Sequence, residues 1–326
     1  MKRIFAHIAS LLLIVAVAWN VSACGSRNEN KGKTSGDQLS GNITLSGTFA
    51  LYPLAVKWAG DFQKLHPDVT IDISAGGAGK GLTDALCDVV DLGMVSRDLD
   101  PSELQRGAFT IPVAKDAVVP TINAKNPVIK DLQTKGVKRQ VFVDLWMTGK
   151  QLSWGQIAGT ANKNGVVVYT RSDACGAADT WAKYLGGKQE HLKGTGVFGD
   201  PGVASSVQKD VNGIGMNNIG YVFDYKTGKL NPDIAIVPID VNGNGKIDAD
   251  ENFYSDRSQL AKAIADGRYP TPPARDLFMV SHGKPKNPVV IEFLKYVLTK
   301  GQQANEEQGY IAVSEDKIKD SLKKLK

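Results

Sequence analysis

The stretch "VYTRSDACGAADTWAKYL", Val168–Leu185, contains a strand pattern, a short loop and a helix pattern in direct succession. Residues 166–169 form a β-branched and aromatic run, which is typical of a strand. After the loop, Trp181 and Leu185 recur at helical spacing on one apolar face. A helix that begins directly after such a loop presents free N–H groups and the positive end of its dipole, which favour an anion. The stretch therefore predicts an α/β unit with an anion site at its turn.

Two earlier stretches repeat this order of strand, small-residue loop and helix. They are "NITLSGTFALYPLAVKWAGDFQKL", Asn42–Leu65, and "VTIDISAGGAGKGLTDAL", Val69–Leu86. A third segment, "MVSRDL" at Met94–Leu99, adds Ser96 and Arg97. Strand runs that alternate with helix-period runs predict an α/β protein. The loop "GGAGKGL" lacks the spacing of the nucleotide-binding phosphate loop, so no nucleotide site is expected.

The N-terminus has the pattern of an export signal over residues 1–23. A positively charged start precedes the apolar run Ile8–Ala18, which is too short to span a bilayer at about 20 residues. We expect Cys24 to be the lipidated first residue of the mature chain, and cleavage without a lipid is the alternative. Residues 24–40 are polar and contain Gly and Ser, which is typical of a flexible tether. The pattern predicts an exported, membrane-anchored lipoprotein that faces the periplasm or the cell exterior.

Length and composition narrow the classes of partner. The 326 residues suffice for two core-forming units, since a domain takes about 100–200 residues. The net charge is +5, but no dense basic tract lies outside the two ends, so nucleic acid is not an expected partner. His66, His191 and His282 show no metal-ligand spacing. The sequence alone does not show whether Cys87 and Cys175 form a disulfide.

The chain resembles the phosphate-binding proteins of bacterial ABC phosphate transporters, as a lipoprotein branch with altered ligand loops. The resemblance covers nearly all of residues 41–315. It rests on nine segments in order: "LSGTF", "ISAGGAGKGLTDAL", "DLGMVSRDL", "IPVAKDAVVPTIN", "WGQI", "VVVYTRSDACGAADTW", "GIGMNNIGYV", "DGRYPTPPARDLFMV" and "EQGYIAVSED".

The resemblance implies a two-domain type II periplasmic-binding-protein fold, α/β in class, with two crossovers and an interdomain ligand cleft. Domain one is expected to comprise residues 41–115 plus 226–326, and domain two residues 116–225. The first crossover would be "IPVAKDAVVP", and the second would lie near "NNIGYVFD". A cleft between domains is a common place for a ligand. The protein is expected to be a monomer.

The resemblance also implies which residues contact the anion. They are Thr48, Phe49, Ala78, Gly79, Ser96, Arg97, Asp98, Arg171, Asp173, Cys175, Gly176 and Ala177. In the family, the loop that corresponds to Arg171–Ala177 has the pattern Arg-x-Asp-x-Ser-Gly-Thr. In this chain, Cys175 and Ala177 replace the two hydroxyl residues. A thiol is a weak hydrogen-bond donor. The resemblance makes phosphate the expected ligand, and the loss of these hydroxyl donors makes another tetrahedral oxyanion, such as molybdate or tungstate, the alternative.

The residue types at this loop leave several roles open. Arg171 either clamps an oxyanion or forms only an ion pair with Asp173. A cysteine phosphatase needs an arginine after its nucleophile and a general acid, and neither follows Cys175, so we expect a binding protein rather than an enzyme. Asp98 or Asp173 would select phosphate over sulfate by accepting a ligand proton. Asp98 is alternatively a helix cap or a surface residue.

The stretch "DVNGNGKIDADE", Asp240–Glu251, matches the twelve-residue EF-hand calcium loop, with Gly245 at its turn. The predicted oxygen ligands come from Asp240, Asn242, Asn244, the Lys246 carbonyl, Asp248 and Glu251. The preceding "IAIVPI" has a strand pattern, so the loop is expected to be a single structural Ca²⁺ site rather than one of a pair. A turn without metal is the alternative.

Taken together, these patterns predict the substrate-binding lipoprotein of an ABC transporter, which captures inorganic phosphate and delivers it to the permease. Two alternatives remain open at this stage. One is an exported phosphoryl-processing enzyme, which turnover of a phosphoester would reveal. The other is a calcium-dependent surface adhesion module, in which the anion loops would bind no ligand.

Overall fold

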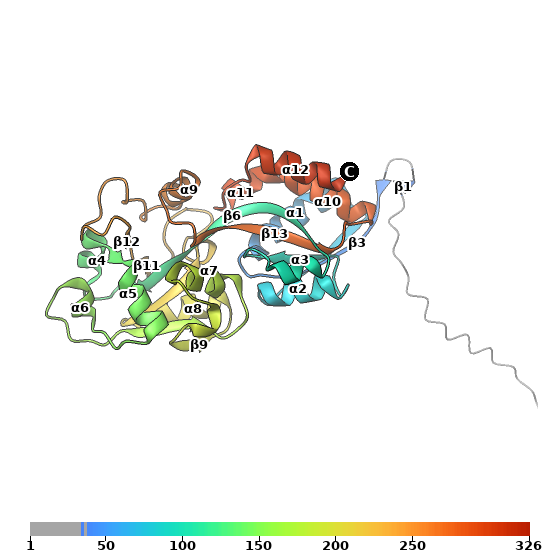
Figure 1. The fold of residues 1–326 in the computed structure, drawn as a ribbon. Helices are drawn as coiled ribbons and strands as arrows, with labels where there is room; N and C mark the ends of the chain where they lie inside the picture. The colour runs from blue at the N-terminus through green and yellow to red at the C-terminus, as the bar shows by residue number, and fades with distance from the viewer. Residues whose placement is uncertain (1–33, 36–37) are drawn as a thin grey trace, which may run out of the picture. The chain divides into compact units, whose positions relative to one another are not determined.

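A nine-stranded mixed sheet is the framework of the computed structural model, which describes residues 34–35 and 38–326 (Figure 1). Its strand order is β4-β3-β5-β13-β6-β10-β8-β9, and β11 pairs with β6 beside this path. The strands are β3 (Gly41–Gly47), β4 (Val69–Ala75), β5 (Leu92–Val95), β6 (Ala108–Asn123), β8 (Val167–Arg171), β9 (Thr195–Val197), β10 (Gly213–Asn218), β11 (Ile234–Ile236) and β13 (Ala274–His282).

Helices follow most of these strands, as the alternating sequence pattern predicts. They are α1 (Tyr52–Leu65), α2 (Ala78–Leu86), α3 (Pro101–Gln105), α4 (Ile129–Lys135), α5 (Arg139–Val143), α6 (Trp154–Ala158), α7 (Gly176–Leu185), α8 (Gly199–Lys209), α9 (Arg257–Ala265), α10 (Pro288–Leu298), α11 (Gln303–Glu307) and α12 (Glu315–Leu325). The pairs β3–α1, β4–α2 and β8–α7 are the three predicted strand–loop–helix units, and the predicted α/β class is confirmed.

Shorter elements complete the described chain. Two small sheets pair β1 (Thr34–Ser35) with β2 (Gln38–Leu39), and β7 (Val137–Lys138) with β12 (Ile239–Asp240). Four short helical turns are Asp144–Thr148, Gln189–His191, Ile219–Tyr221 and Lys300–Gln302.

The long strand β6 joins the two halves of the sheet. Its first part, residues 108–117, pairs antiparallel with β13, and its second part pairs with β10 and β11. In Figure 1, β6 and β13 run together between two groups of helices. Nearly all of β6 after residue 115 is buried, since both faces of a strand in this position are covered.

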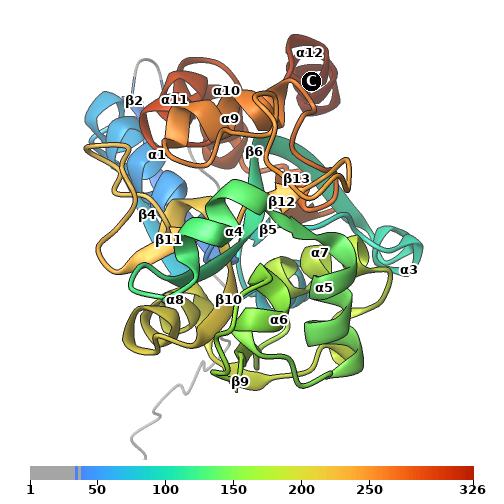
Figure 2. The ribbon, with the colours of Figure 1, turned by 90° about the vertical axis from the view of Figure 1, so that its left-hand side faces the viewer.

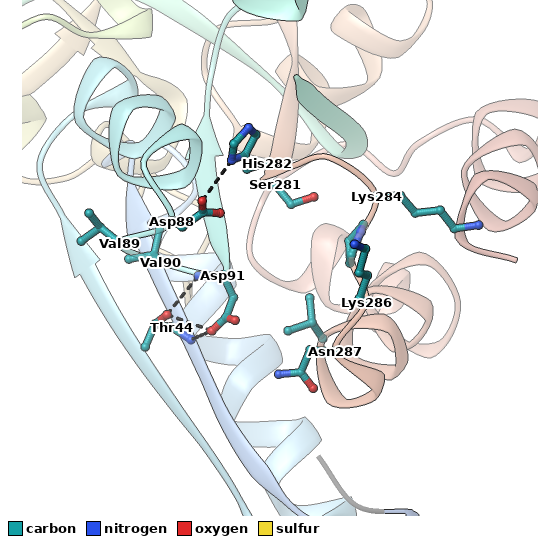
Figure 3. Close-up of a pocket in the computed structure, with 12 residues that line it drawn as sticks. Thr44, Asp88, Val89, Val90, Asp91, Ser281, His282, Lys284, Lys286 and Asn287 are labelled. Carbon is teal, nitrogen blue, oxygen red and sulfur yellow. Dashed lines mark hydrogen bonds and ion pairs between the residues drawn. The ribbon is translucent and has the colours of Figure 1, made fainter. Parts of the chain in front are cut away.

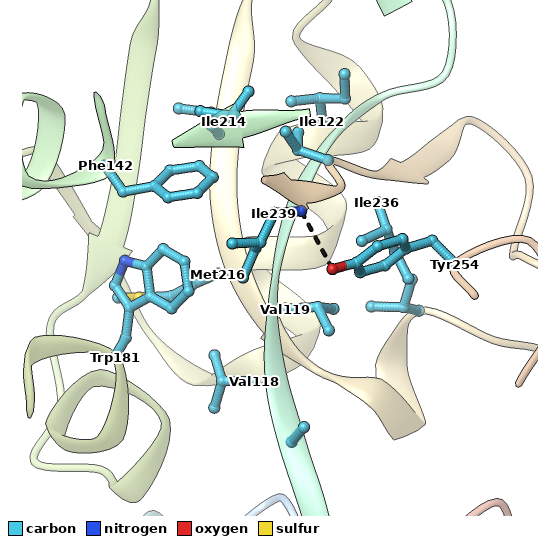
Figure 4. Close-up of a cluster of buried hydrophobic side chains, with 14 of the residues drawn as sticks. Val118, Val119, Ile122, Phe142, Trp181, Ile214, Met216, Ile236, Ile239 and Tyr254 are labelled. Carbon is cyan, nitrogen blue, oxygen red and sulfur yellow. Dashed lines mark hydrogen bonds between the residues drawn. The ribbon is translucent and has the colours of Figure 1, made fainter. Parts of the chain in front are cut away.

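Buried apolar side chains form two main cores on either side of this junction. Lobe one, residues 41–114 and 277–326, packs α1, α10, α11 and α12 around residues such as Trp58 and Phe293. Lobe two, residues 117–274, has a core in which Trp181 contacts Phe142 and Trp146 at centroid distances of 5.3 and 5.4 Å. Figure 4 shows part of this second core, and Figure 2 views the molecule with α4 to α8 toward the reader.

The packing of residues 234–274 differs from the predicted domain bounds, which placed residues 226–326 together in domain one. Their buried side chains, including Phe253 and Tyr269, belong to the core of lobe two. The physical cause is strand pairing, because Ile234 and Ile236 of β11 lie opposite Asn123 and Thr121 of β6. The chain re-enters lobe one along β13. Whether the two lobes fold as separate domains stays a prediction.

Most of the predicted N-terminal features lie outside the described residues. This applies to the signal peptide at 1–23, the lipidated Cys24 and most of the tether at 24–40, of which β1 and β2 are described. Within the part of the chain that the structure describes, no helix is both long and apolar enough to cross a bilayer.

Candidate anion site

The loops at the carboxyl ends of β3, β4, β5 and β8 meet at one place. Thr48 follows β3, and its Oγ1 lies 2.7 Å from Oγ of Ser96, which follows β5. Gly176 opens α7 against the same serine: a Cβ on Gly176 would lie 2.3 Å from the Ser96 carbonyl oxygen and Oγ. Such a contact is impossible for any other residue type, so the glycine is needed for the approach of the two lobes. Ligands commonly bind at the carboxyl ends of strands in α/β sheets.

The glycine loop after β4 closes on the same loop of lobe two. Gly79 donates its backbone N–H to the Ala174 carbonyl at 3.3 Å. Gly77 caps α2 with a φ of +92°, and a Cβ there would lie 2.8 Å from the Ala174 oxygen. In the first turns of α2 and α7, the N–H groups of Gly79 and Ala178 already donate, to the Ala174 carbonyl and to Cys175 Sγ. The other first N–H groups have no acceptor inside their own helices and can serve a small anion.

Arg171 is the central charge of this site. Its Nε and Nη2 donate to the two Asp173 oxygens at 2.8 and 2.6 Å, and its Nη1 donates to Asp200 Oδ2 at 2.6 Å. Only 1% of its side chain is exposed. Burial disfavours its charge, but the charges of Asp200 and Asp173 prevail and raise the pKa of Arg171 above its ordinary value. A guanidinium has five N–H donors, so two are left for a ligand.

Asp200 is a buried partner that the sequence analysis missed. It stands in the first turn of α8, where an aspartate is ordinary, and no local pattern marks it as a site residue. Its Oδ1 accepts from Nδ2 of Asn218 at 2.6 Å. Asn218 in turn accepts from Arg275 of β13, whose Nε donates to Asp116 of β6 at 2.8 Å. A chain of buried polar groups thus connects Arg171 with the two strands that join the lobes.

Aromatic contacts close one side of the loop cluster. The guanidinium of Arg171 lies 5.7 Å from the centre of the Phe49 ring, which is within cation–π range. Phe198, at the start of α8, meets the same ring edge-on at 5.9 Å. Tyr221 donates its hydroxyl to the Phe49 carbonyl at 3.0 Å. Phe49 of lobe one is therefore held by side chains of lobe two.

The sequence of this chain matches the model of a known protein family. The model described as the PBP superfamily domain matches residues 32–300. The chain belongs to this family.

Named members of similar sequence are phosphate-binding proteins. Phosphate-binding protein PstS of Pseudomonas aeruginosa is 29% identical, covering 100% of this chain and 99% of that protein. Phosphate-binding protein PstS of Bacillus subtilis is 26% identical and covers 94% of both chains.

Solved structures share the fold. A phosphate ABC transporter substrate-binding protein with bound phosphate from Clostridium perfringens has a TM-score of 0.69 and 22% identity, covering 84% of this chain and 100% of that one. An ABC-type phosphate transport receptor from Vibrio cholerae has a TM-score of 0.61 and 18% identity, covering 83% and 100%. These structures confirm the predicted fold class.

Two of the family-derived anion contacts lie apart from the loop cluster. Arg97 turns to Glu103 in α3 and donates to its two oxygens at 2.8 and 2.7 Å. Asp98 is exposed and lines a cavity near the junction of the lobes, together with Lys115. The structure brings the other ten predicted residues to the meeting point of the loops or to the helix starts beside it: Thr48, Phe49, Ala78, Gly79, Ser96, Arg171, Asp173, Cys175, Gly176 and Ala177.

Cys175 caps α7 and is almost fully buried. Its sulfur accepts the N–H of Ala178 at 3.4 Å. Burial raises the pKa of the Cys175 thiol to about 12, although the charge of Arg171 opposes this. The thiol therefore stays protonated at neutral pH and is no activated nucleophile. Cys87 is exposed, and neither of these cysteines forms a disulfide in the described residues.

We expect iodoacetamide at pH 8 to modify Cys87 and to leave Cys175 intact in the folded protein. The thiolate is the reactive form, and a thiol with a pKa of about 12 is protonated at that pH. Peptide mapping by mass spectrometry distinguishes the two positions, and both should react after denaturation. Rapid modification of Cys175 in the native protein would contradict the assignment of an inert, buried cap.

The predicted calcium loop takes a tight turn whose carboxylates accept hydrogen bonds. Asp240 accepts the N–H groups of Gly243 and Gly245 at 2.7 and 2.9 Å, and Glu251 Oε1 accepts that of Val241 at 2.9 Å. Asn242 and Asn244 donate to Asp248, which also pairs with Lys246. Among the residues that the structure describes, no three His, Cys, Asp or Glu side chains are placed so that they could hold a metal. The calcium site stays a prediction.

A cavity of about 390 Å³ lies in lobe one, away from the loop cluster (Figure 3). In Figure 3, His282 points to Asp88, and their ring nitrogen and carboxylate are 3.1 Å apart. Asp91 accepts from the backbone and hydroxyl of Thr44 at 2.8 and 2.9 Å. None of the predicted anion or metal ligands lines this cavity.

Proposed function

We propose that this chain is the substrate-binding component of an ABC transporter for inorganic phosphate. The observation that carries the proposal is the convergence of two helix starts, the Thr48 and Ser96 hydroxyls and the buried Arg171 at one point between the lobes. Backbone N–H groups, hydroxyls and a guanidinium are the donors that a tetrahedral oxyanion requires. Relatives named phosphate-binding proteins support the same ligand.

The site supports binding rather than catalysis. Its one thiol has a pKa of about 12, and no histidine belongs to the described loops that meet here. A phosphoryl-transferring enzyme needs an activated nucleophile and a general acid. We expect no turnover of a generic phosphoester.

The test is titration calorimetry with phosphate, arsenate, sulfate, molybdate and tungstate. Tight binding of phosphate supports the proposal. A second candidate is a molybdate- or tungstate-like ligand, which the replacement of two hydroxyl residues of the family pattern by Cys175 and Ala177 favours. If the protein binds molybdate or tungstate more tightly than phosphate, that oxyanion is the ligand and the phosphate proposal is wrong.

We expect phosphate and arsenate to bind at least about tenfold more tightly than sulfate, which is about 1.4 kcal/mol. Asp173 and Asp200 carry two negative charges against the one positive charge of Arg171, so an anion without a proton meets an excess of negative charge. Burial alone would raise the pKa of Asp173, but the bonds and charge of Arg171 lower it, so the ionised carboxylate can accept a hydrogen bond from a protonated ligand oxygen. Sulfate carries no such proton.

The variant Asp173→Asn should reduce this discrimination, whereas Asp98→Asn should not, because Asp98 lies outside the loop cluster. Equal affinity of the wild-type protein for sulfate and phosphate would refute the proton-acceptor role.

Three further proposals rest on the sequence. Cys24 would carry the lipid that anchors an exported, monomeric protein to the membrane, and metabolic labelling with a fatty acid tests this. The ABC permease would be the protein partner. The loop at Asp240–Glu251 would bind a structural Ca²⁺ ion, which its complete EF-hand ligand pattern supports.

A further inference from the structure

A second cavity, of about 310 Å³, lies where the two strands that join the lobes cross between them. We call it the hinge cavity. Lys115 of β6 and Asp276 of β13 line it, and these two residues are direct partners in the antiparallel register. Lobe one adds Lys317 of α12, and lobe two adds Thr180 and Lys183 of α7. A molecule in this cavity would contact both lobes and the strands between them.

The lining of the hinge cavity is predominantly basic. It contains five arginine or lysine residues and two aspartates. Arg97 is paired with Glu103 and Arg275 with Asp116, so these two charges are already balanced. Asp276 is already paired with Lys317. Lys183 pairs with Asp179 of its own helix at 2.9 Å, and both of these side chains are within reach of water.

Lys115 differs from the other four basic residues of the lining, because its side chain has no ion-pair partner among the described residues. Its backbone is fixed by a bridge to Ile311, with both N–H···O distances at 2.9 Å. Its ammonium group makes no hydrogen bond or ion pair with any residue that the structure describes, although it is half-buried. Cross-strand neighbours have Cβ atoms about 4.5–5.5 Å apart, so the Asp276 carboxylate is near, but Lys317 occupies it. A half-buried ammonium without a partner favours an anion from solution.

We propose that the hinge cavity is a second anion site, which binds a small compound with two or more phosphoryl or carboxylate groups. Lysine residues of three elements line the cavity, namely Lys115 of β6, Lys317 of α12 and Lys183 of α7, so a ligand with more than one anionic group can pair with more than one of them. The Thr180 hydroxyl accepts from Arg275 at 3.2 Å and keeps its own proton for the ligand. Asp98 is the lining carboxylate with no bond in the described chain, and it opposes anion binding.

Occupancy of the hinge cavity should strengthen binding at the loop cluster. Thr180 and Lys183 belong to α7, whose first residue Gly176 contacts Ser96 in the candidate anion site. A ligand that bridges the lobes stabilises the arrangement in which these loops meet, and coupling between two sites is reciprocal. This coupling, unlike the second site itself, rests on the proposed phosphate function.

The test is calorimetric titration with pyrophosphate and, separately, citrate at low ionic strength, with the loop cluster saturated by phosphate. We expect binding of at least one probe to the wild-type protein. Lys115→Met keeps the apolar stem and removes the charge, and it should weaken that binding at least about tenfold. Lys319→Met is the matched control, because it makes the same change on α12 outside the cavity and should leave the affinity unchanged. Asp98→Asn should strengthen binding.

The two probes separate the sources of the negative charge. Binding of pyrophosphate alone assigns phosphoryl compounds, and binding of both assigns any compact polyanion. Absence of binding by both, or equal affinity in wild type and Lys115→Met, overturns the site. Unchanged phosphate affinity at saturating probe overturns the coupling. Loss of the proposed function would look different, because phosphate would then fail to bind while the Lys115-dependent titration persists.

Discussion

Replacement of Arg171 by alanine is expected to abolish measurable phosphate binding and to lower the free energy of unfolding by about 3–5 kcal/mol. The guanidinium has three bonds to Asp173 and Asp200 in a buried setting, and its removal leaves two carboxylates close together without a cation. The cost of such an uncompensated pair exceeds the value of the bonds themselves. The sequence alone presented clamp and ion pair as alternatives, whereas the structure gives one arginine the contacts for both roles.

Calorimetry and denaturant unfolding measure the two effects separately. Arg139→Ala is a suitable control, because this exposed arginine donates to the Tyr184 carbonyl, near the opposite end of α7 from Gly176. Arg139→Ala should lower the free energy of unfolding by at most about 1 kcal/mol. Arg171→Lys keeps the charge but loses the planar guanidinium group. Compared with Arg171→Ala, it should restore much of the free energy of unfolding but little of the phosphate affinity.

A double variant identifies the origin of the instability. Adding Asp200→Asn to Arg171→Ala should restore part of the lost stability, since it removes one of the two unpaired buried charges. Phosphate binding should not return. If Arg171→Ala binds phosphate with wild-type affinity, the arginine is a structural ion pair only. If the double variant is less stable than Arg171→Ala, the charge argument is wrong.

The parts of the fold that the sequence predicts well are governed by local patterns. The strand before Arg171 and the helix after it follow from the β-branched run and from the spacing of Trp181 and Leu185. The same holds for Gly77, whose φ of +92° favours a glycine, whereas the need for Gly176 arises from the close approach of the distant Ser96. Local chemistry of this kind is readable without knowing what the loop meets.

The missed features depend on contacts between distant parts of the chain. Asp200 is 29 positions from Arg171, and Asn218 follows it by another 18, so no spacing rule connects them. The resemblance predicts that Arg97 contacts the anion, but Glu103 in the next helix accepts two hydrogen bonds from the Arg97 guanidinium and holds it away from the loop cluster. A side chain with alternative partners adopts the orientation that tertiary packing favours.

The calcium loop is the remaining feature with a large expected effect. Its motif brings Asp240, Asp248 and Glu251 into twelve residues, and Lys246 is the one basic residue among the twelve. Asp240 and Glu251 are buried, at 3% and 5% exposure, so their charges are poorly screened by water. A bound divalent cation would relieve this repulsion, and the loop oxygens are the hard ligands that Ca²⁺ prefers.

The loop is fastened to lobe two at several points. Ile247 donates its N–H to the Thr134 carbonyl at 2.8 Å, and β12 pairs with β7 directly before the loop. The side chain of Ile247 covers Gly136, where a Cβ would lie 2.5 Å from its Cδ1. Ordering of the loop by a metal would therefore stabilise the end of α4 and the fold around it, rather than an isolated turn.

We expect excess Ca²⁺ to stabilise the folded protein by about 2.7 kcal/mol when free calcium is a hundredfold above its dissociation constant. Chelation should lower the melting temperature, and Glu251→Gln should remove most of the difference, because it deletes the bidentate ligand. The variant should still fold without metal, since the amide oxygen in the place of Oε1 can accept the N–H groups of Val241 and Asn242, and only the bond from the Asp248 N–H to Oε2 is lost. Glu292→Gln on the surface of α10 is the matched control.

Phosphate affinity should be nearly the same with calcium and with chelator, because no residue of the loop contacts the candidate anion site. Melting curves that coincide in excess calcium and in chelator would show that Asp240–Glu251 is a turn without metal. A calcium-dependent shift that survives Glu251→Gln would place the ion elsewhere in the chain. A shift that disappears in this variant but persists in Glu292→Gln assigns the ion to the loop, since the two changes differ only in which carboxylate becomes an amide.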